Sequence, residues 1–284
     1  MENNSCGMIL EGGAMRGIFT AGILDFFLDN GIKIPNILAI SAGAYAGMNY
    51  VSGQRGRCVE AIVKPLERYK YISLSTFLKK GALFDMDFLF DQVPKEVPFD
   101  FESFRSSGMR FITSTVDCEK GEAVYYEDFR DEKEFFHICK AANSLPLIAR
   151  ITEVDGRPML DGGMADAIPV VKALEEGWEK IVVVFTREAS YRKKEKTFDQ
   201  RLTTFIYRKY PNFIKLIEGR SKRYNDAIET IARLEEEGRA FVFRPTRVKL
   251  KNKETNVDRL MEYYQHGYDT AKERYREFME FLRG

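Results

Sequence analysis

Segments of strand length alternate with helical patterns along the first two thirds of the chain, and this alternation constrains the fold more than any other feature. The apolar runs end at turn signals, and each helical pattern repeats apolar residues at helical spacing. Parallel β-α units with helices on both faces of one sheet show this alternation. The sequence therefore predicts a doubly wound α/β fold. We expect strands at 6–10, 37–40, 111–116 and 181–185, and helices at 18–30, 42–51, 131–142 and 170–177.

The length and composition agree with this fold class. With 284 residues, 44% hydrophobic and 31% charged, the chain has the composition of a soluble globular protein. The formal net charge is +1, so charge alone attracts the chain neither to nucleic acid nor to an anionic membrane. We expect no nucleic-acid partner, no metal and no cofactor, and the oligomeric state is left open.

The N-terminus and the cysteines favour a cytoplasmic protein. The first residues carry the acidic Glu2 where a secretion signal has basic residues, and no apolar run reaches the roughly 18 residues of a transmembrane helix. The four cysteines are scattered without a C-x-x-C pair, which favours buried reduced thiols over disulfides or a zinc site. They are Cys6, Cys58, Cys118 and Cys139.

The composition changes after Thr186. Basic and aromatic residues mix from 187 to 223, two later segments repeat apolar residues at helical spacing, and "RAFVFRP" between them has the length of a strand. A lone apolar stripe cannot form its own core, so the C-terminal part is expected to pack on the first part. The sequence thus predicts a single domain over 1–284, with a core over about 6–190 and a helix-rich extension over about 191–284.

Two glycine-rich turns carry the candidate chemistry, and the second presents a serine. In "ILAISAG" an apolar strand runs into Ser41, and a helix of small residues follows. Such a turn lifts the side chain above the carboxyl end of the sheet, beside helix N-terminal amides that favour developing negative charge. The G-x-S-x-G signature of a nucleophile elbow is met except at its first glycine, which is Ala39. Ser41 is a candidate nucleophile, and the alternative is that it only caps the helix.

The first turn, "LEGGAMRG", is a candidate anion-binding loop. Gly12 and Gly13 leave main-chain N–H groups accessible, and Arg16 adds a cation. A phosphate is one candidate anion, but the loop has neither the G-x-G-x-x-G order nor the G-x-x-x-x-G-K-[ST] order of nucleotide-binding loops. The other candidate is the oxyanion of an acyl-transfer intermediate, for which one donor contributes about 3 to 4 kcal/mol.

A serine nucleophile needs a base for its proton. Both histidines, His137 and His266, fall in helical patterns rather than in a loop after a strand. Asp161 follows a short apolar strand in "RPMLDGG", and the glycines after it let the main chain approach closely. Asp161 is therefore the better candidate base, and the alternative is an ordinary turn residue.

The chain resembles the patatin-like phospholipase family over about residues 6–186. "EGGAMRG" is similar to that family's D-G-G-G-x-R-G loop, "AISAG" to its G-x-S-x-G elbow, and "DGG" to its D-G-[GA] motif, in the same order. "AANSLPLIARI" resembles the segment that precedes the family's dyad aspartate. The resemblance implies a three-layer α/β/α fold with a mainly parallel sheet. It also implies a lipid acyl hydrolase, of phospholipase A or esterase type, that works without a cofactor.

The resemblance also implies roles for individual residues. Ser41 is the nucleophile and Asp161 the base of a Ser-Asp dyad that requires no histidine. The residues assigned to the oxyanion hole are Gly12, Gly13, Ala14 and Arg16.

Three residues depart from the family's pattern. Glu11 stands for aspartate, Ala14 for the third glycine of the loop, and Ala39 for the first glycine of the elbow. Ala14 matters most, because alanine is tolerated there only if the position does not need a positive φ.

Two aromatic stretches are candidates for contact with substrate or lipid. The first could wall a groove for an acyl chain, although such clusters are more often core; its side chains are Phe77, Leu78, Leu83, Phe84, Phe88 and Phe90. The second, 191–224, is a candidate for transient contact with a membrane surface, and the alternative is a solvated helical face. The side chains considered for shallow insertion are Phe198, Phe205, Tyr207 and Tyr210.

Two other functions stay open at this point. An α/β-hydrolase with the triad Ser41, Asp161 and His266 has the same chain order. A non-catalytic protein that binds lipid or acyl chains would keep the fold while the alanines at 14 and 39 disable the site.

Overall fold

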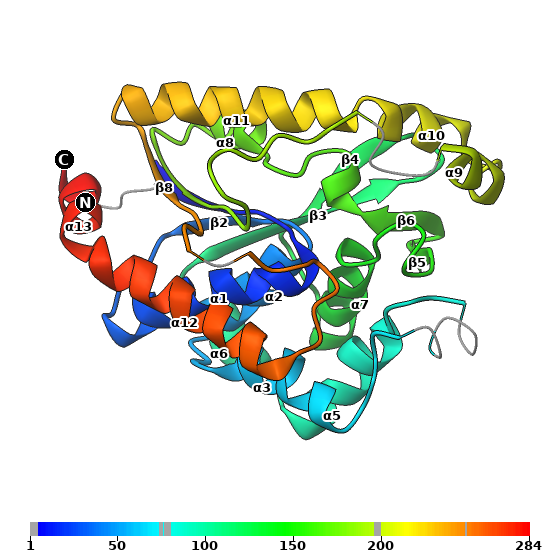
Figure 1. The fold of residues 1–284 in the computed structure, drawn as a ribbon, viewed down its shortest axis with the longest axis horizontal. Coiled ribbons are helices and arrows are strands. Elements are labelled where there is room, and N and C mark those ends of the chain that lie inside the picture. Colours follow the sequence, from blue (N-terminus) through cyan, green and yellow to red (C-terminus); the bar gives the residue numbers. More distant parts are fainter. Residues whose placement is uncertain (1–4, 74–75, 77–80, 196–199, 248) are drawn as a thin grey trace.

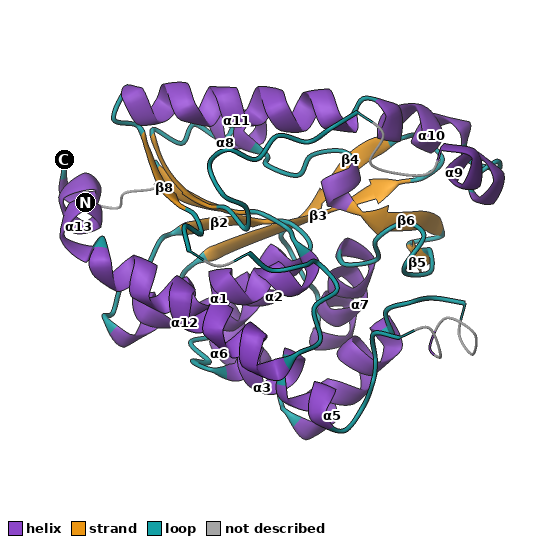
Figure 2. Cartoon of the chain, viewed as in Figure 1, coloured by secondary structure: helices purple, strands orange, loops and turns teal. Residues whose placement is uncertain are grey.

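A computed structural model shows a central sheet with helices on both faces (Figure 1). It describes residues 5–73, 76, 81–195, 200–247 and 249–284. The strands form the middle layer and the helices the two outer layers (Figure 2). This three-layer α/β/α arrangement confirms the predicted fold class.

The sheet is mainly parallel. Its strands are β1 (Cys6–Leu10), β2 (Asn36–Ala39), β3 (Arg110–Asp117), β4 (Glu122–Tyr126), β5 (Thr152–Val154), β6 (Arg157–Asp161), β7 (Lys180–Val184) and β8 (Ala240–Phe243). Parallel pairing joins β3 to β2, β2 to β1, β1 to β7 and β7 to β8. Antiparallel pairing joins β4 and β6 to β3, and β5 to β6.

The helices follow the strands in the expected alternation. In the first part of the chain they are α1 (Gly17–Asp29), α2 (Ala42–Val51), α3 (Arg57–Ile62), α5 (Val93–Glu96), α6 (Phe101–Ser106), α7 (Glu132–Ala142) and α8 (Val170–Glu175). The C-terminal part has α9 (Gln200–Ile206), α10 (Pro211–Glu218), α11 (Arg220–Glu236), α12 (Val257–Glu273) and α13 (Tyr275–Arg283). Short turns of other helix types are η1 (Ala14–Arg16), η2 (Lys64–Glu67), η3 (Phe88–Gln92) and η4 (Gly162–Met164).

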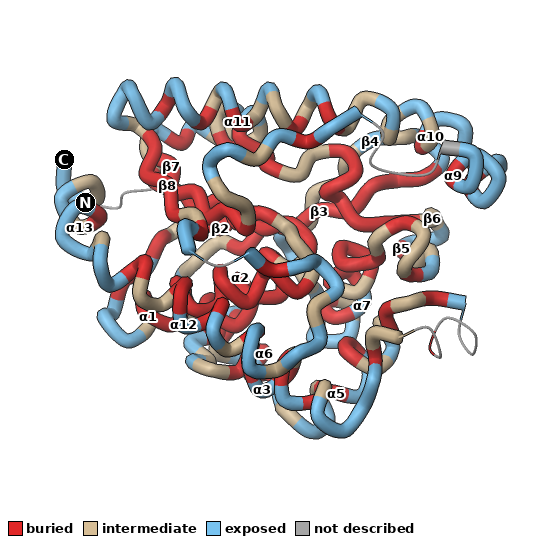
Figure 3. Tube along the Cα trace, in the orientation of Figure 1, coloured by how far each residue is buried: buried red, intermediate tan, exposed pale blue. Residues whose placement is uncertain are grey.

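Both faces of the parallel strands are buried (Figure 3). Side chains alternate between the two faces along a strand. In β1, Met8 and Leu10 pack in the core cluster that includes α1, α2 and α12, whereas Ile9 packs in the cluster that includes α8 and α11. This explains why the strand segments read as continuous apolar runs rather than as alternating ones.

Helix α12 packs along α1, and a glycine on each helix permits the close approach. A methyl group at Gly22 would lie 2.0 Å from the Tyr264 carbonyl oxygen, and one at Gly267 would lie 2.0 Å from the Phe19 carbonyl oxygen. Helix α1 is therefore enclosed between the sheet and α12, and its residues up to Phe27 are buried.

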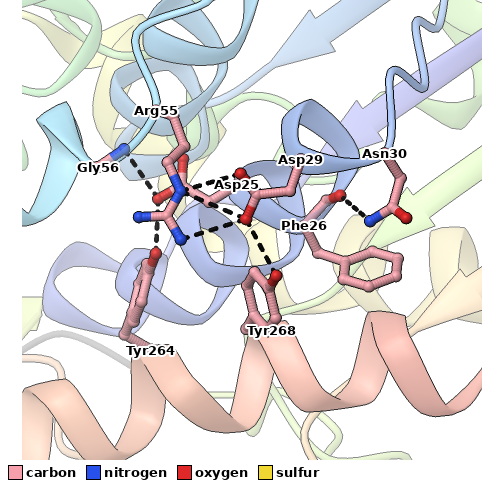
Figure 4. Close-up of polar contacts among 8 residues, drawn as sticks. All are labelled: Asp25, Phe26, Asp29, Asn30, Arg55, Gly56, Tyr264 and Tyr268. Carbon is pink, nitrogen blue, oxygen red and sulfur yellow. Dashed lines mark hydrogen bonds and ion pairs between the residues drawn. The ribbon is translucent and has the colours of Figure 1, made fainter.

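Polar contacts reinforce this packing (Figure 4). The Asp25 carboxylate accepts a hydrogen bond of 2.7 Å from the Tyr264 hydroxyl. The Asp29 carboxylate accepts one of 3.0 Å from the Tyr268 hydroxyl and pairs with Arg55 at 3.1 Å. Two tyrosines of α12 are thus held by carboxylates on α1.

The predicted elements are present, with ends shifted by one or two residues. "RAFVFRP" contributes β8, which pairs with β7, and the four cysteines are buried free thiols, as expected. The second C-terminal stripe is divided at Arg274 into α12 and α13. Among the described helices, none has the length and apolar character needed to cross a lipid bilayer.

Candidate active site

Ser41 lies at the turn between β2 and α2 in a strained main-chain conformation. Its φ is 56° and its ψ is −126°, a combination that non-glycine residues rarely adopt and that costs on the order of 1 to 3 kcal/mol. Its side chain makes no capping hydrogen bond to α2. The helix-cap alternative is therefore wrong, and the strain marks a residue that the surrounding structure holds in an unfavourable conformation.

The first glycine turn passes directly over this serine. A methyl group at Gly12 would lie 2.7 Å from Ser41 Cβ and 3.4 Å from its hydroxyl oxygen, so only glycine permits this approach. Within the part of the chain that the structure describes, the N–H groups of Gly12, Gly13 and Ala14 have no main-chain hydrogen-bond partner. These donors remain available to an anion at the serine.

Ala14 has a φ of 49°, so this position of the loop does take a positive φ. Alanine accepts the left-handed region at a cost of about 1 to 2 kcal/mol. Alanine would be unstrained here only at a negative φ, so Ala14 is strained. The loop nevertheless lies against Ser41. The other alanine, Ala39, is fully buried in β2, where its methyl group belongs to the core.

Asp161 reaches Ser41 because two strands end at the same place on the sheet. On β3, Thr113 pairs with Ala39 of β2, and Thr115 pairs with Asp161 of β6. Strand β4 occupies the opposite edge of β3 at both residues, so β2 and β6 share one edge and meet there from opposite directions. Ser41, two residues beyond Ala39, is therefore level with Asp161.

The Asp161 carboxyl is completely buried and only partly hydrogen-bonded. Its Oδ1 accepts a hydrogen bond of 2.8 Å from the Gly163 amide. Its Oδ2 has no partner among the described residues. Burial raises the pKa of Asp161 to about 6, and the nearby Ser41 hydroxyl and the Gly163 amide oppose the rise. The serine is thus close enough to affect the carboxyl, although the two fall short of a fully formed hydrogen bond.

Glu11 fixes the glycine turn to two distant segments. One oxygen of its carboxylate accepts hydrogen bonds from the Thr186 amide at 2.6 Å and the Thr186 hydroxyl at 3.0 Å. The other accepts one of 2.6 Å from the Tyr224 hydroxyl. The departure from aspartate at this position therefore gives a longer side chain that reaches both the end of β7 and helix α11.

A cavity of about 530 Å³ opens at these turns, and both Ser41 and Asp161 line it together with Gly12, Gly13, Ala14 and Arg16. All six residues that the sequence singled out thus lie at one site. Arg16 is buried, its Nε has no partner among the described residues, and burial lowers the pKa of its guanidinium.

A smaller apolar pocket of about 50 Å³ also reaches Ser41. Phe84 and Phe90, two side chains considered for the acyl groove, line this pocket. Leu83 lines the larger cavity instead, and Phe88 stacks on Tyr71. Phe77 and Leu78 lie outside the described residues.

Sequence reasoning missed four cationic residues of the larger cavity: Arg187, Lys193, Arg220 and Lys253. Arg220 donates a hydrogen bond of 2.9 Å from Nε to the Gly163 carbonyl oxygen. Lys193 is buried, and its ammonium lies 4.1 Å from the centre of the Tyr224 ring. The segments around these residues contain many other basic side chains, which is also typical of a solvated surface. Their local sequence therefore did not distinguish the residues that line the cavity from those that face solvent.

Neither histidine lines the cavity that holds Ser41 and Asp161. His266 is buried in α12, its Nε2 accepts a hydrogen bond of 3.0 Å from the Thr246 amide, and it packs on Phe19. The triad with His266 is therefore wrong. His137 contacts the Glu153 carbonyl oxygen at 2.6 Å on the surface.

The stretch 191–224 is divided between core and surface. Tyr207 is buried and its hydroxyl accepts a hydrogen bond of 3.0 Å from the Leu147 amide, so the expectation that it inserts into lipid is wrong. Phe205 is 67% exposed, Tyr210 is partly buried, and Phe198 lies outside the described residues.

No group of three or more histidine, cysteine or carboxylate side chains that could hold a metal ion occurs among the residues that the structure describes.

Comparison with known proteins gives two family matches along the chain. The model of the patatin-like phospholipases matches residues 8–174. The model of a domain of unknown function (DUF6363) matches residues 210–283.

Two individual relatives were compared. The uncharacterized protein YjjU of Escherichia coli K12 is 27% identical over 184 residues, which cover 63% of this chain and 51% of YjjU. The structure of VipD from Legionella pneumophila aligns with a TM-score of 0.45 and 13% identity, over 95% of this chain and 66% of that one. The chain thus spans about half the length of its curated relative. With more than half of its residues matched by the family model, the chain belongs to the patatin-like phospholipase family.

Proposed function

We propose that this protein is a serine lipid acyl hydrolase that cleaves acyl esters through a Ser41–Asp161 dyad. The observation that carries the proposal is a buried carboxyl oxygen of Asp161. It has no partner among the described residues, and it lies at the level of a strained serine, below a turn whose amides have no main-chain partner there. A buried polar atom without a partner is rare in native proteins and needs an explanation. A proton taken from the serine supplies one.

In the first step, Ser41 Oγ attacks the ester carbonyl carbon while its proton passes to Asp161. A general base works best when its pKa is near the operating pH. Burial brings the pKa of Asp161 to about 6, so the carboxylate is a better base than an exposed aspartate and is still largely ionised at neutral pH.

The negative charge of the tetrahedral intermediate develops on the former carbonyl oxygen. The free amides of Gly12, Gly13 and Ala14 are the donors for this oxyanion, and the buried cation of Arg16 adds favourable potential. Collapse of the intermediate returns the proton from Asp161 to the departing alcohol oxygen. Water then attacks the acyl-serine with Asp161 again as base, which releases the carboxylic acid and restores the serine.

The two cavities suggest how an ester would lie. The apolar pocket, lined in part by Tyr45, Phe84 and Phe90, suits the acyl chain, and the larger polar cavity suits the alcohol part. Both reach Ser41, so the ester bond would be placed at the serine.

A cytoplasmic location stays a prediction.

Hydrolysis of 4-nitrophenyl butyrate tests the proposal. Ser41→Ala and Asp161→Asn should each lower kcat/KM by about 10³-fold or more, because nucleophile and base act as one unit. Ser52→Ala is the matched control, since Ser52 is also buried but its hydroxyl donates to the Asn49 carbonyl oxygen away from the cavity. Hydrolysis that survives in Ser41→Ala would contradict the proposal.

The remaining alternative is a lipid-binding protein without catalysis. It predicts no turnover by the wild type and binding of acyl chains that is equal in wild type and Ser41→Ala. Ala39 packs in the core, whereas Ala14 keeps a positive φ in the glycine loop, so turnover by the wild type decides between this alternative and the hydrolase.

A further inference from the structure

The larger cavity has an unusual balance of charge. Five cationic side chains line it, against the two carboxylates of Glu11 and Asp161. The cations are Arg16, Arg187, Lys193, Arg220 and Lys253. Four of them come from segments that lie after β7 and are no part of the proposed dyad: Arg187, Lys193, Arg220 and Lys253.

Three cations of this cluster have no carboxylate within ion-pair distance among the described residues. Arg16, Arg187 and Lys193 form no ion pair there within 4.0 Å. The Glu11 carboxylate is already engaged by Thr186 and Tyr224. Burying a cation is costly unless an anion compensates it, so the cluster is arranged for an anion that comes from outside the chain.

The aromatic rings beside the cluster are also occupied. The Arg187 guanidinium lies 4.1 Å from the centre of the Tyr191 ring, and the Lys193 ammonium lies 4.1 Å from that of Tyr224. Open aromatic faces and free carboxylates are what recognise a quaternary ammonium group. The cations that line the cavity thus favour an anionic ligand. The rings of Tyr191 and Tyr224 are already in contact with protein cations, so a choline-type ligand has few groups to bind it.

We propose that Arg187, Lys193 and Arg220 form a subsite for a phosphate group on the alcohol part of the ester, so that the substrate class is an anionic acylglycerol phosphate rather than a neutral or choline-bearing ester. The inference rests on the proposed function, because the subsite opens into the same cavity as Ser41. Arginine and lysine are the usual partners of phosphate oxygens.

Protonation of Lys193 gives an independent readout. Burial and the neighbouring cations Arg220, Arg187 and Arg16 lower the pKa of Lys193 to about 7, and Glu11 opposes them. At pH 8 the ammonium is therefore mostly deprotonated before a ligand binds. A bound phosphate dianion favours the charged form, so binding at pH 8 should be accompanied by proton uptake.

Calorimetric titration of Ser41→Ala protein with sn-glycerol 3-phosphate tests the subsite without catalysis. We expect binding that weakens with salt, no binding of glycerol, and proton uptake at pH 8 seen as a dependence on the buffer's ionisation enthalpy. Adding Lys193→Met should weaken binding about tenfold or more and abolish the proton uptake. Lys194→Met is the matched control, because Lys194 is exposed and lies outside the cavity.

Hydrolysis with the wild-type serine separates the possible sources of the phosphate. The wild type should cleave a 1-acylglycerol 3-phosphate with at least tenfold higher kcat/KM than the 1-acylglycerol of the same chain length, and Lys193→Met should remove this preference. Inorganic phosphate that binds as tightly as glycerol 3-phosphate, with no preference between the two esters, would indicate a site for free phosphate and overturn the substrate assignment.

The subsite and the proposed function can fail separately. If glycerol 3-phosphate does not bind, or if Lys193→Met and Lys194→Met bind it equally, the subsite is wrong whatever the esterase result. If it binds as expected while no ester is hydrolysed, the subsite stands and the proposed catalysis is wrong.

Discussion

At the scale of single residues, the candidate site combines two unfavourable features. Ser41 has a positive φ, and the buried Asp161 carboxyl has one oxygen without a partner in the part of the chain that the structure describes. Neither feature stabilises the fold, and such features persist where the surrounding structure over-determines them. In the function that we propose, they are the nucleophile and a base whose pKa has moved toward neutrality.

The pKa of Asp161 predicts the pH dependence of catalysis. The base must be ionised to accept the serine proton, so kcat/KM for an aryl ester should fall as pH decreases through about 6. The groups facing Asp161 are Ser41, Gly163, Arg220 and Lys193. A pH–rate profile of the wild type measures this limb, and activity that is unchanged down to pH 4 would contradict the assignment of the base.

The same shift predicts an effect on stability. The folded pKa of Asp161 lies above its ordinary value of 3.8, so the folded state retains a proton that the unfolded state loses, and stability falls as pH rises from about 4 to about 6. Asp161→Asn should therefore raise the free energy of unfolding at pH 8, on the order of 1 to 3 kcal/mol. Denaturant unfolding at pH 8 and at pH 4 measures it. The gain should disappear at pH 4, and a loss of stability at pH 8 would contradict burial as the cause.

The sequence singled out Ser41 and Asp161 but not the cations that line the same cavity. Ser41 and Asp161 follow strands and precede glycines, which is a local pattern. Arg187, Lys193 and Arg220 reach the cavity only through the packing of later segments. No local spacing distinguishes them from the other basic residues around them, so they could not be identified before the fold was known.

At the scale of elements, the dyad depends on where strands end. Strands β2 and β6 meet along one edge of β3, and this meeting brings together residues 120 positions apart in the chain. The sequence predicted the parallel strands, whose buried runs are continuous. It did not predict β4, which is half-buried, or β5, which has three residues. Of the antiparallel strands β4, β5 and β6, the sequence therefore predicted only the short strand that precedes Asp161.

Helix α9 is the element best suited to the proposed contact with a membrane. Leu202, Phe205 and Ile206 are 47%, 67% and 46% exposed, and the basic residues Arg201 and Arg208 are exposed beside them. Such a surface combines apolar insertion with attraction to anionic headgroups. We propose that it rests on the lipid surface from which the substrate comes.

Co-sedimentation with liposomes tests this contact. Binding should rise with the fraction of anionic lipid, and Phe205→Ser should weaken it about tenfold, since burying one aromatic side chain contributes about 1.5 to 3 kcal/mol. Val171→Ser is the matched control, because Val171 is 59% exposed on α8, outside this stretch. Binding that ignores anionic lipid content would refute the idea.

At the scale of the whole molecule, the C-terminal part completes the first part. It adds β8 to the sheet, packs α12 on α1, and supplies Tyr224 and Arg220 to the candidate site. The matched DUF6363 region begins at residue 210 and so includes these elements. We propose that the chain folds as one domain, as its sequence predicted from the lone apolar stripes.

Calorimetry of thermal unfolding tests the single domain. We expect one transition with equal calorimetric and van't Hoff enthalpies. Gly267→Ala should move the whole transition to lower temperature, because its methyl group would clash with the Phe19 carbonyl oxygen. Glu262→Ala, on the exposed side of the same helix, should leave it in place. Two resolved transitions in the wild type would show two independent units.

The central claim is that Ser41 is an activated nucleophile and that Asp161 activates it. A fluorophosphonate probe measures this most directly, because it modifies only a serine whose proton can be removed and needs no knowledge of the natural substrate. Mass spectrometry of the labelled protein should find the probe on Ser41 of the wild type, no label in Ser41→Ala, and strongly slowed labelling in Asp161→Asn. Wild-type protein that stays unlabelled, or Asp161→Asn protein that reacts as fast as the wild type, would contradict the account.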